Sequence, residues 1–236
     1  MGKYTNRTAL EYHQRQLNNP YESTKQLVKF VGKYLEKGDI KNVIDIPCGS
    51  GINIIELSKL YQGIDYLGVD ISKEAIDLGR KYINVNGIKN IQLFEENLYS
   101  LDNLINYKFD ASLIIQTLFC MEDPFDALKI VIKQTKKFLF INSLFTYDSL
   151  FIKTKVIKLD NENEHFFNII PIKKLQKFLE PFGGEIIEIE ELIMPIDIEK
   201  KGNGLGSHTK KLFNNERLVF TSDIYLPWKL IAIKFS

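Results

Sequence analysis

The chain has 236 residues, of which 44% are hydrophobic and 26% are charged, a size and composition typical of one globular domain. With 31 basic and 30 acidic residues its formal net charge is +1, so the charge balance requires neither a nucleic acid nor an anionic membrane as a partner. Two cysteines are too few for a disulfide framework or a zinc cluster, and we predict no bound metal. The polar N-terminus and the lack of a long apolar run predict a cytoplasmic protein without a membrane span.

Between residues 42 and 142, short apolar runs alternate with helical patterns. The predicted strands are 42–46, 65–70, 90–95, 109–115 and 137–142. The predicted helices are 52–62, 72–86, with Ser72 as its cap, 101–107 and 124–135. Because right-handed helical crossovers join parallel strands and cover both faces of the sheet, this order predicts a doubly wound α/β fold.

The sequence on either side of this region has a different character. The first 40 residues are helical and could cover the cleft of the sheet. After the fifth strand we expect an insertion over 144–168, a helix over 171–182 and a strand over 184–194. A glycine-rich loop over 200–211 should then lead to two strands parted by Pro227.

Two carboxylates mark the ends of the first two strands. Asp45 ends the first and is followed by a turn that contains Gly49 and Gly51, while Asp70 ends the second. Ligands of open parallel sheets lie beyond these strand ends, and a carboxylate there can accept hydrogen bonds from two ribose hydroxyls. A dinucleotide fingerprint needs a third glycine, but Ile54 occupies that position, and an acid before the turn would repel a pyrophosphate. The pattern therefore indicates a nucleoside ligand and disfavours a nicotinamide dinucleotide.

Four segments resemble the motifs of class I S-adenosylmethionine-dependent methyltransferases: "VIDIPCGSG", "GVDIS", "FEENLYSL" and "FDASLIIQTLF". They keep the expected order and spacing over residues 42–142. The sequence departs from the family at Pro47, where a glycine is usual, and at Asn97, where an aspartate is usual. The resemblance implies cofactor contacts from Asp45, Gly49, Gly51, Asp70, Ile71, Asn97, Leu98 and Gln116. In that assignment Asp70 holds the ribose, the two glycines admit the methionine moiety, and Asn97 and Leu98 flank the adenine.

Candidates for the remaining roles lie outside these motifs. Residues 11–24 could form a lid in which Arg15 or Tyr21 binds the cofactor carboxylate, or they could be a solvated amphipathic helix. His165 is the candidate proton acceptor, although a histidine at the edge of the core is the ordinary reading. The candidate substrate contacts are Thr117, Tyr147 and Trp228. The segment "NNPY" imitates an amine-methylating signature, but it precedes the first strand instead of following the fourth.

The resemblance implies a three-layer Rossmann-like fold with a seven-stranded sheet whose last strand is antiparallel. We expect one domain over 1–236, with a helical cap (1–40), a cofactor-binding half (41–143) and a substrate half (144–236). The expected activity is methylation of an oxygen on a small molecule or saccharide, without nucleic acid, by a chain that could form a homodimer. The alternatives are an amine- or RNA-directed methyltransferase, an NAD-dependent reductase and a non-catalytic binding subunit with the same fold.

Overall fold

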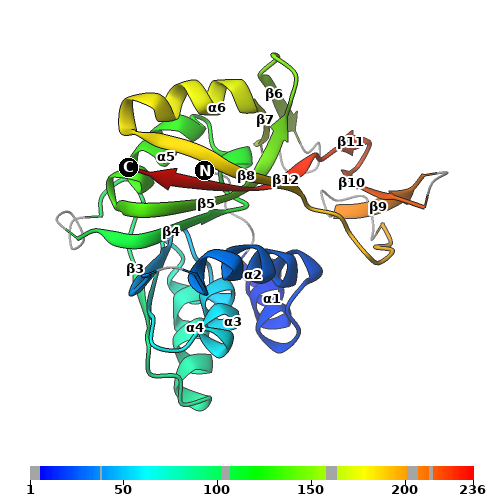
Figure 1. The fold of residues 1–236 in the computed structure, drawn as a ribbon. Helices are drawn as coiled ribbons and strands as arrows, with labels where there is room; N and C mark the ends of the chain where they lie inside the picture. Colours follow the sequence, from blue (N-terminus) through cyan, green and yellow to red (C-terminus); the bar gives the residue numbers. More distant parts are fainter. Residues whose placement is uncertain (1–5, 38, 102–106, 158–163, 201–206, 213–214) are drawn as a thin grey trace.

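The described residues contain a central sheet of seven strands in the order β3-β2-β1-β4-β5-β12-β8 (Figure 1). These strands are β1 (Asn42–Asp45), β2 (Asp65–Asp70), β3 (Ile91–Glu95), β4 (Phe109–Ile115), β5 (Thr135–Thr146), β8 (Gly184–Glu191) and β12 (Trp228–Phe235). The first five are mutually parallel, whereas β12 runs antiparallel to both β5 and β8. The predicted fold class is therefore confirmed, including the antiparallel last strand.

This computed structural model describes residues 6–37, 39–101, 107–157, 164–200, 207–212 and 215–236. Most of the helix expected over 101–107 lies outside these residues, as do part of the expected insertion and the glycine-rich stretch 201–206.

Helices cover both faces of the sheet, as the crossover argument requires. One face carries α2 (Glu22–Leu35), α3 (Ile52–Leu60) and α4 (Lys73–Val85), and the other carries α5 (Pro124–Lys133) and α6 (Ile172–Leu179). Alternate strand residues separate these two cores: Val43 packs on the first face and Ile44 on the second. The predicted cap of α4 is confirmed, because the Ser72 hydroxyl accepts a hydrogen bond of 3.2 Å from the N–H of Ala75.

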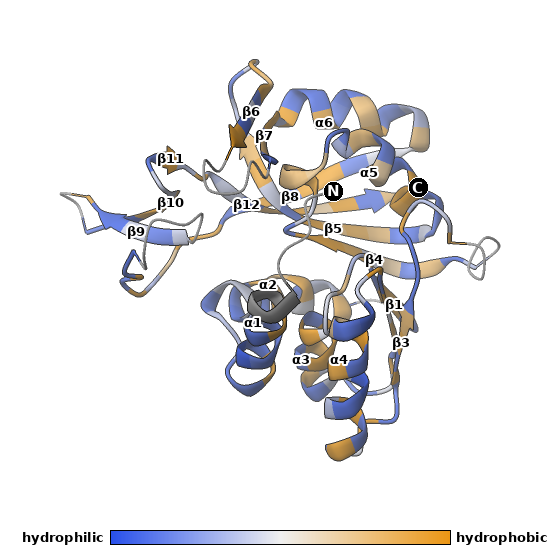
Figure 2. Cartoon of the chain, turned by 180° about the vertical axis from the view of Figure 1, so that it is seen from behind, coloured by the Kyte–Doolittle hydropathy of each residue, from blue (hydrophilic) through white to orange (hydrophobic). Residues whose placement is uncertain are grey.

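Two helices at the N-terminus approach the carboxyl ends of the strands. Helix α1 (Asn6–Asn18) contacts α4, and the apolar face of α2 packs on the sheet, with the Phe30 ring 6.3 Å from that of Phe140. From α2, Lys33 also donates hydrogen bonds to Glu188 and Glu190 on the edge strand β8. Figure 2 shows the contrast between the hydrophobic central strands and the mainly hydrophilic surface of α1. No helix among the described residues is long and apolar enough to cross a membrane.

The C-terminal part contains more strands than the sequence predicted. The expected insertion holds the antiparallel pair β6 (Ile152–Ile157) and β7 (Glu164–Pro171), and the end of β7 continues beside the end of β5. The expected glycine-rich loop includes a strand, β9 (Ser207–Lys211). It pairs with β10 (Arg217–Thr221), and β10 pairs on its other side with β11 (Ile224–Tyr225). The prediction of two strands around Pro227 was wrong in number: β10 and β11 are separate strands before β12. Ser222, with φ +51°, lies in the tight turn between β10 and β11.

Candidate functional site

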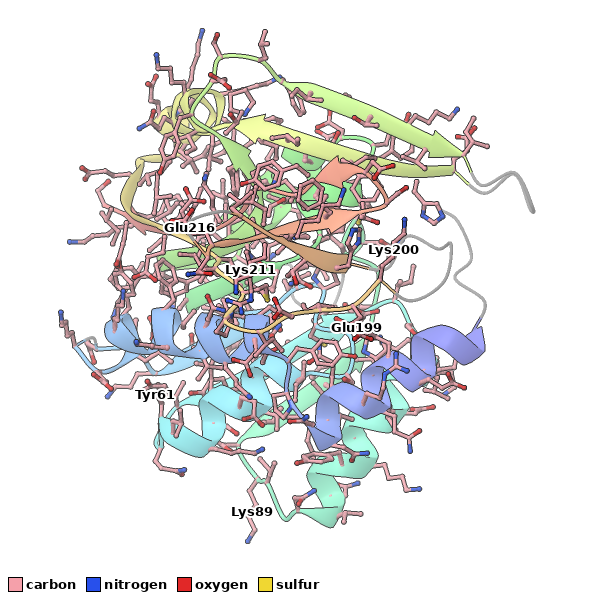
Figure 3. All side chains as sticks on the ribbon, turned by 90° about the vertical axis from the view of Figure 1, so that its right-hand side faces the viewer. Tyr61, Lys89, Glu199, Lys200, Lys211 and Glu216 are labelled. Carbon is pink, nitrogen blue, oxygen red and sulfur yellow. The ribbon has the colours of Figure 1, made fainter. Side chains whose placement is uncertain are left out.

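A cavity of about 220 Å³ opens at the carboxyl ends of the central strands. Its lining comes from the turn after β1, the end of β2, the exits of β4 and β5, and the N-terminal helices α1 and α2. The lining residues are Tyr12, His13, Gln16, Ser23, Thr24, Leu27, Pro47, Cys48, Gly49, Ile52, Asn53, Asp70, Ile115, Gln116, Thr117 and Asn142. A larger cavity of about 350 Å³ lies at the opposite end of the strands, near Lys89 (labelled in Figure 3). The first has the position that open α/β sheets use for ligands.

The turn after β1 depends on its two glycines. Gly49 has φ +56° and Gly51 has φ +78°, in the left-handed region that favours glycine. A Cβ atom at Gly51 would also lie only 2.9 Å from the Leu93 side chain. Helix α3 begins directly after the turn, so the unpaired N–H groups of its first residues face the same region. This stretch of backbone can therefore approach a ligand closely.

The carboxylate of Asp70 is held in a fixed orientation at the end of β2. One oxygen accepts a hydrogen bond of 2.7 Å from the N–H of Gly49, and the other accepts one of 2.8 Å from the N–H of Ser72. Each carboxylate oxygen has a second lone pair, so the group can still accept two further hydrogen bonds. Two adjacent ribose hydroxyls could donate these hydrogen bonds, and the ribose contact of Asp70 stays a prediction.

Asp45 occupies a very different environment beneath the turn. Its side chain is fully buried, and one oxygen accepts a hydrogen bond of 3.1 Å from the amide of Asn53. The other oxygen has no partner among the described residues. Burial raises the pKa of Asp45 to about 8, against the lowering effect of Asn53 and with a smaller raising contribution from the charge of Asp70. Asn53 lines the cavity and Asp45 does not, which supports a role for Asp45 in ordering the turn.

The residues predicted to flank an adenine lie outside the cavity lining. Ile71 is 53% exposed, directly after Asp70. Leu98 is buried in the core, and Asn97 uses its side-chain oxygen to accept a 2.9 Å hydrogen bond from the N–H of Tyr99. The adenine contacts of Asn97 and Leu98 and the cofactor contact of Ile71 stay predictions.

The exits of β4 and β5 form the other end of the cavity. Gln116 and Thr117 line it, as the sequence predicted for residues that border the transfer site. Gln116 has φ +51°, and the Thr117 hydroxyl donates to the carbonyl of Ile115 at 2.9 Å. Asn142 also lines the cavity and was missed, although a polar residue at the end of a buried strand is a signal that could have indicated it.

Helix α1 covers the cavity with residues other than those predicted. His13 and Gln16 line it, whereas Arg15 and Tyr21 do not. Arg15 is exposed and hydrogen-bonds the Tyr21 side chain, and the N–H of Tyr21 donates to the Gln16 side chain at 3.2 Å. Residues three apart share one face of a helix, so the spacing of His13 and Gln16 was the available signal. The predicted contacts of Arg15 and Tyr21 with the cofactor carboxylate stay predictions.

An aromatic cluster lies beside the exit of β4. The Phe119 ring is 4.9 Å from that of Trp228 and 5.8 Å from that of Phe167. His165 is two residues before Phe167 on β7 and so leaves the same face of that strand. None of these four side chains lines the cavity, but Phe119 follows Thr117 by two positions, which places the cluster next to the cavity.

Tyr147 lies apart from this cluster. It is 64% exposed, and its ring lies 4.8 Å from the Lys229 ammonium. Lys229 and Trp228 are consecutive in β12, so their side chains leave opposite faces of the sheet. Substrate contacts from Tyr147 and Trp228 stay predictions.

Comparisons with known proteins agree with this geometry. The family model for "Methyltransferase domain" matches residues 37–189. The ribosomal protein L11 methyltransferase of Caldanaerobacter subterraneus subsp. tengcongensis is 29% identical over 160 residues, which are 67% of this chain and 47% of that protein. The chain thus spans about half the length of this curated relative.

Two solved structures illustrate how widely the fold is shared. Magnesium protoporphyrin IX methyltransferase from Synechocystis PCC 6803 with bound S-adenosylmethionine has a TM-score of 0.61 at 12% identity, covering 95% of this chain and 90% of that one. The [4+2]-cyclase SpnF has a TM-score of 0.56 at 17% identity, covering 71% and 59%. Strand order, the glycine turn, the position of Asp70 and the family match together show that this chain belongs to the class I S-adenosylmethionine-dependent methyltransferases.

Proposed function

We propose that this chain transfers the methyl group of S-adenosylmethionine to an oxygen of a small, neutral acceptor that carries hydroxyl groups, such as a saccharide. The observation that carries this proposal is the chemistry of the cavity lining. Among the described lining residues, Asp70 is the only Asp, Glu, Lys or Arg, and it lies at the end assigned to the ribose. Amides and hydroxyls supply most of the remaining polar groups, including those of Gln116, Thr117 and Asn142.

This lining favours one class of acceptor over others. A cationic amine is best held by a carboxylate, and the phosphates of RNA or an anionic small molecule by Lys or Arg. Amide and hydroxyl groups both donate and accept hydrogen bonds, which suits neutral hydroxyls. The apolar cluster of Phe119, Phe167 and Trp228 would then contact the ring faces of a bound acceptor.

The residues present fit the cofactor of the family. Asp70 keeps two lone pairs for the ribose hydroxyls, and Gly49, which has no side chain of its own, lines the cavity beside it. Bound S-adenosylmethionine supplies an activated methyl group on a sulfonium. The main task of the protein is to hold the acceptor in line with that group, and such positioning can contribute about 7–11 kcal/mol.

The proposal is tested by incubating the purified chain with S-adenosylmethionine and separate acceptors. The set comprises neutral saccharides, phenols, ribosomal protein L11 and ribosomal RNA, with S-adenosylhomocysteine release and the methylated atom as readouts. We expect release with a hydroxylated small molecule and an O-methyl product. Methylation of an L11 amine or of RNA would overturn the choice of acceptor. Binding of S-adenosylhomocysteine without turnover on any acceptor would favour the non-catalytic alternative.

Proton removal from the acceptor oxygen requires a base, and His165 is our candidate because it shares a strand face with Phe167. Replacing a general base typically lowers the rate by about 10²–10⁴-fold. We therefore expect His165→Asn to reduce kcat to that extent while leaving the affinity for S-adenosylhomocysteine unchanged. His208→Asn on β9 is the matched control and should keep kcat. A His165→Asn enzyme with normal kcat would eliminate this assignment.

A further inference from the structure

The imidazole of His13 fills the space that the glycine turn leaves free. A Cβ atom built on Gly49 would lie 2.6 Å from Cε1 of His13 and 3.2 Å from Nδ1. The ring therefore lies directly against the backbone of Gly49, the part of the turn that a ligand must approach. The missing side chain at this position creates room, and in this structure a residue of the protein itself occupies that room.

The same ring lies beside the carboxylate assigned to the ribose. The negative charge of Asp70 raises the pKa of His13, but burial has the larger effect and lowers it below the ordinary value. The ring of Tyr12 stands at 5.3 Å in an edge-on arrangement. His13 is therefore favoured in its neutral form while it sits in the cavity.

Contacts besides that of His13 hold helix α1 over the cavity, and the helix also packs on α4. Leu17 is buried, and the Gln16 amide donates to the Tyr12 hydroxyl at 2.9 Å and accepts from the N–H of Tyr21 at 3.2 Å. The helix ends at Asn18, and α2 begins at Glu22 after a short link that contains Pro20. A helix joined to the next one by such a short link can move as a unit on that link.

The cavity is also small for a complete nucleoside cofactor. At about 220 Å³, it is smaller than the roughly 300–1,000 Å³ of pockets that bury ligands of drug size. A nucleoside that carries a methionine chain needs a pocket of that larger class.

We propose that His13 is a built-in plug of the cofactor site: in the cofactor-free chain its ring occupies the space over Gly49 beside Asp70, and α1 must swing away on the link before α2 to admit the cofactor. The inference depends on the cofactor of the family and is independent of the identity of the acceptor. With a plug of this kind, the apparent Kd for the cofactor equals the intrinsic Kd divided by the fraction of molecules in the open state.

Two substitutions separate a plug from a cofactor contact. His13→Ala removes the ring, and His13→Phe keeps a ring of similar size without a titratable group. If the open state is populated to about 10%, His13→Ala should bind S-adenosylhomocysteine about tenfold more tightly. We expect the gain mainly in the association rate, measured by stopped-flow fluorescence at pH 7.5, while His13→Phe binds no more tightly than the original chain. Weaker or unchanged binding by His13→Ala would overturn the proposal.

A second measurement follows the ring itself. The chain has three histidines, so the imidazole Cε1–H signal of His13 can be assigned in a proton NMR spectrum by its loss in His13→Phe. The other titratable groups that line the cavity are Asp70 on β2, Tyr12 on α1 and the Cys48 thiol. Burial raises the pKa of the Cys48 thiol. Without ligand the signal should titrate below the ordinary histidine pKa of about 6.5, and with saturating S-adenosylhomocysteine it should move toward that value. A pKa that ligand leaves unchanged would contradict displacement of the ring.

Discussion

Asp45 and Asp70 end neighbouring strands, but their surroundings give them opposite chemistry. Asp70 borders the cavity and accepts two backbone hydrogen bonds, which fix the orientation of its carboxylate. Asp45 is fully buried with one amide donor, and burial raises its pKa to about 8. The first carboxylate is thus open to a ligand in the cavity, and the second remains largely protonated at neutral pH beneath the turn.

Replacing Asp70 tests the ribose assignment. Asp70→Asn removes the negative charge and leaves one acceptor oxygen where two are needed. Hydrogen bonds to charged groups contribute about 1.5–3 kcal/mol, so we expect the Kd for S-adenosylhomocysteine to rise about 10- to 100-fold in calorimetry. Asp77→Asn, on the exposed side of α4, is the control and should keep the original Kd. Equal affinity in both variants would show that Asp70 does not bind the cofactor.

The protonation of Asp45 predicts a pH-dependent stability. The folded-state pKa is raised, so the folded chain binds more protons than the unfolded chain between the ordinary Asp value of 3.8 and about 8. The free energy of unfolding should therefore fall as pH rises through this window. Asp45→Asn lacks this titration, so its stability relative to the original chain should increase from about pH 5 to about pH 8.5 in urea denaturation. A stability difference that does not change with pH would refute the raised pKa.

At the scale of elements, helix α4 and the glycine turn are packed backbone against backbone. A Cβ atom at Gly79 would clash with the carbonyl oxygen of Ser50 and would lie 2.6 Å from the Leu93 side chain. Glycine is therefore needed within α4 although it is an unfavourable helix residue. This close approach links the position of α4 to the shape of the turn.

Gly79→Ala should consequently destabilise the chain and weaken cofactor binding. Overpacking typically costs about 1–3 kcal/mol, which outweighs the roughly 1 kcal/mol that alanine gains within a helix. We expect a lower free energy of unfolding in urea and a higher Kd for S-adenosylhomocysteine, because Ser50 belongs to the turn. Val85→Ala, at a position of the same helix that is 77% exposed, should change neither quantity appreciably. A Gly79→Ala chain as stable as the original would show that α4 can shift without penalty.

At the scale of the whole molecule, the two cores of the described residues share the central sheet, and one domain over 1–236 stays a prediction. A ligand that binds only the folded chain stabilises it by about 2.7 kcal/mol at a concentration of 100 Kd. We expect one unfolding transition whose Tm rises with S-adenosylhomocysteine but not with NADH. A rise with NADH alone would restore the reductase alternative.

Size-exclusion chromatography with light scattering tests the homodimer, which stays a prediction.

The sequence by itself determined the five parallel strands, the cap of α4, the turn at Gly49 and Gly51, and Asp70 at a strand end. These features follow from local rules, because hydrophobic period, glycine conformation and helix capping act over a few residues. The resemblance of four motifs to a family then implied a sheet of seven strands with an antiparallel last strand, which periodicity alone does not specify.

Tertiary structure alone decided which residues surround the cavity and how the C-terminal strands pair. His13 and Gln16, and not Arg15, face the cavity because the docking of α1 on the rest of the fold sets its rotation. Strand β9 is short and polar, so its pairing with β10 is visible only when both are in place. The physical reason is common to both, because these arrangements depend on contacts between segments distant in sequence. A local pattern shows which residues share a face, and it does not show what that face contacts.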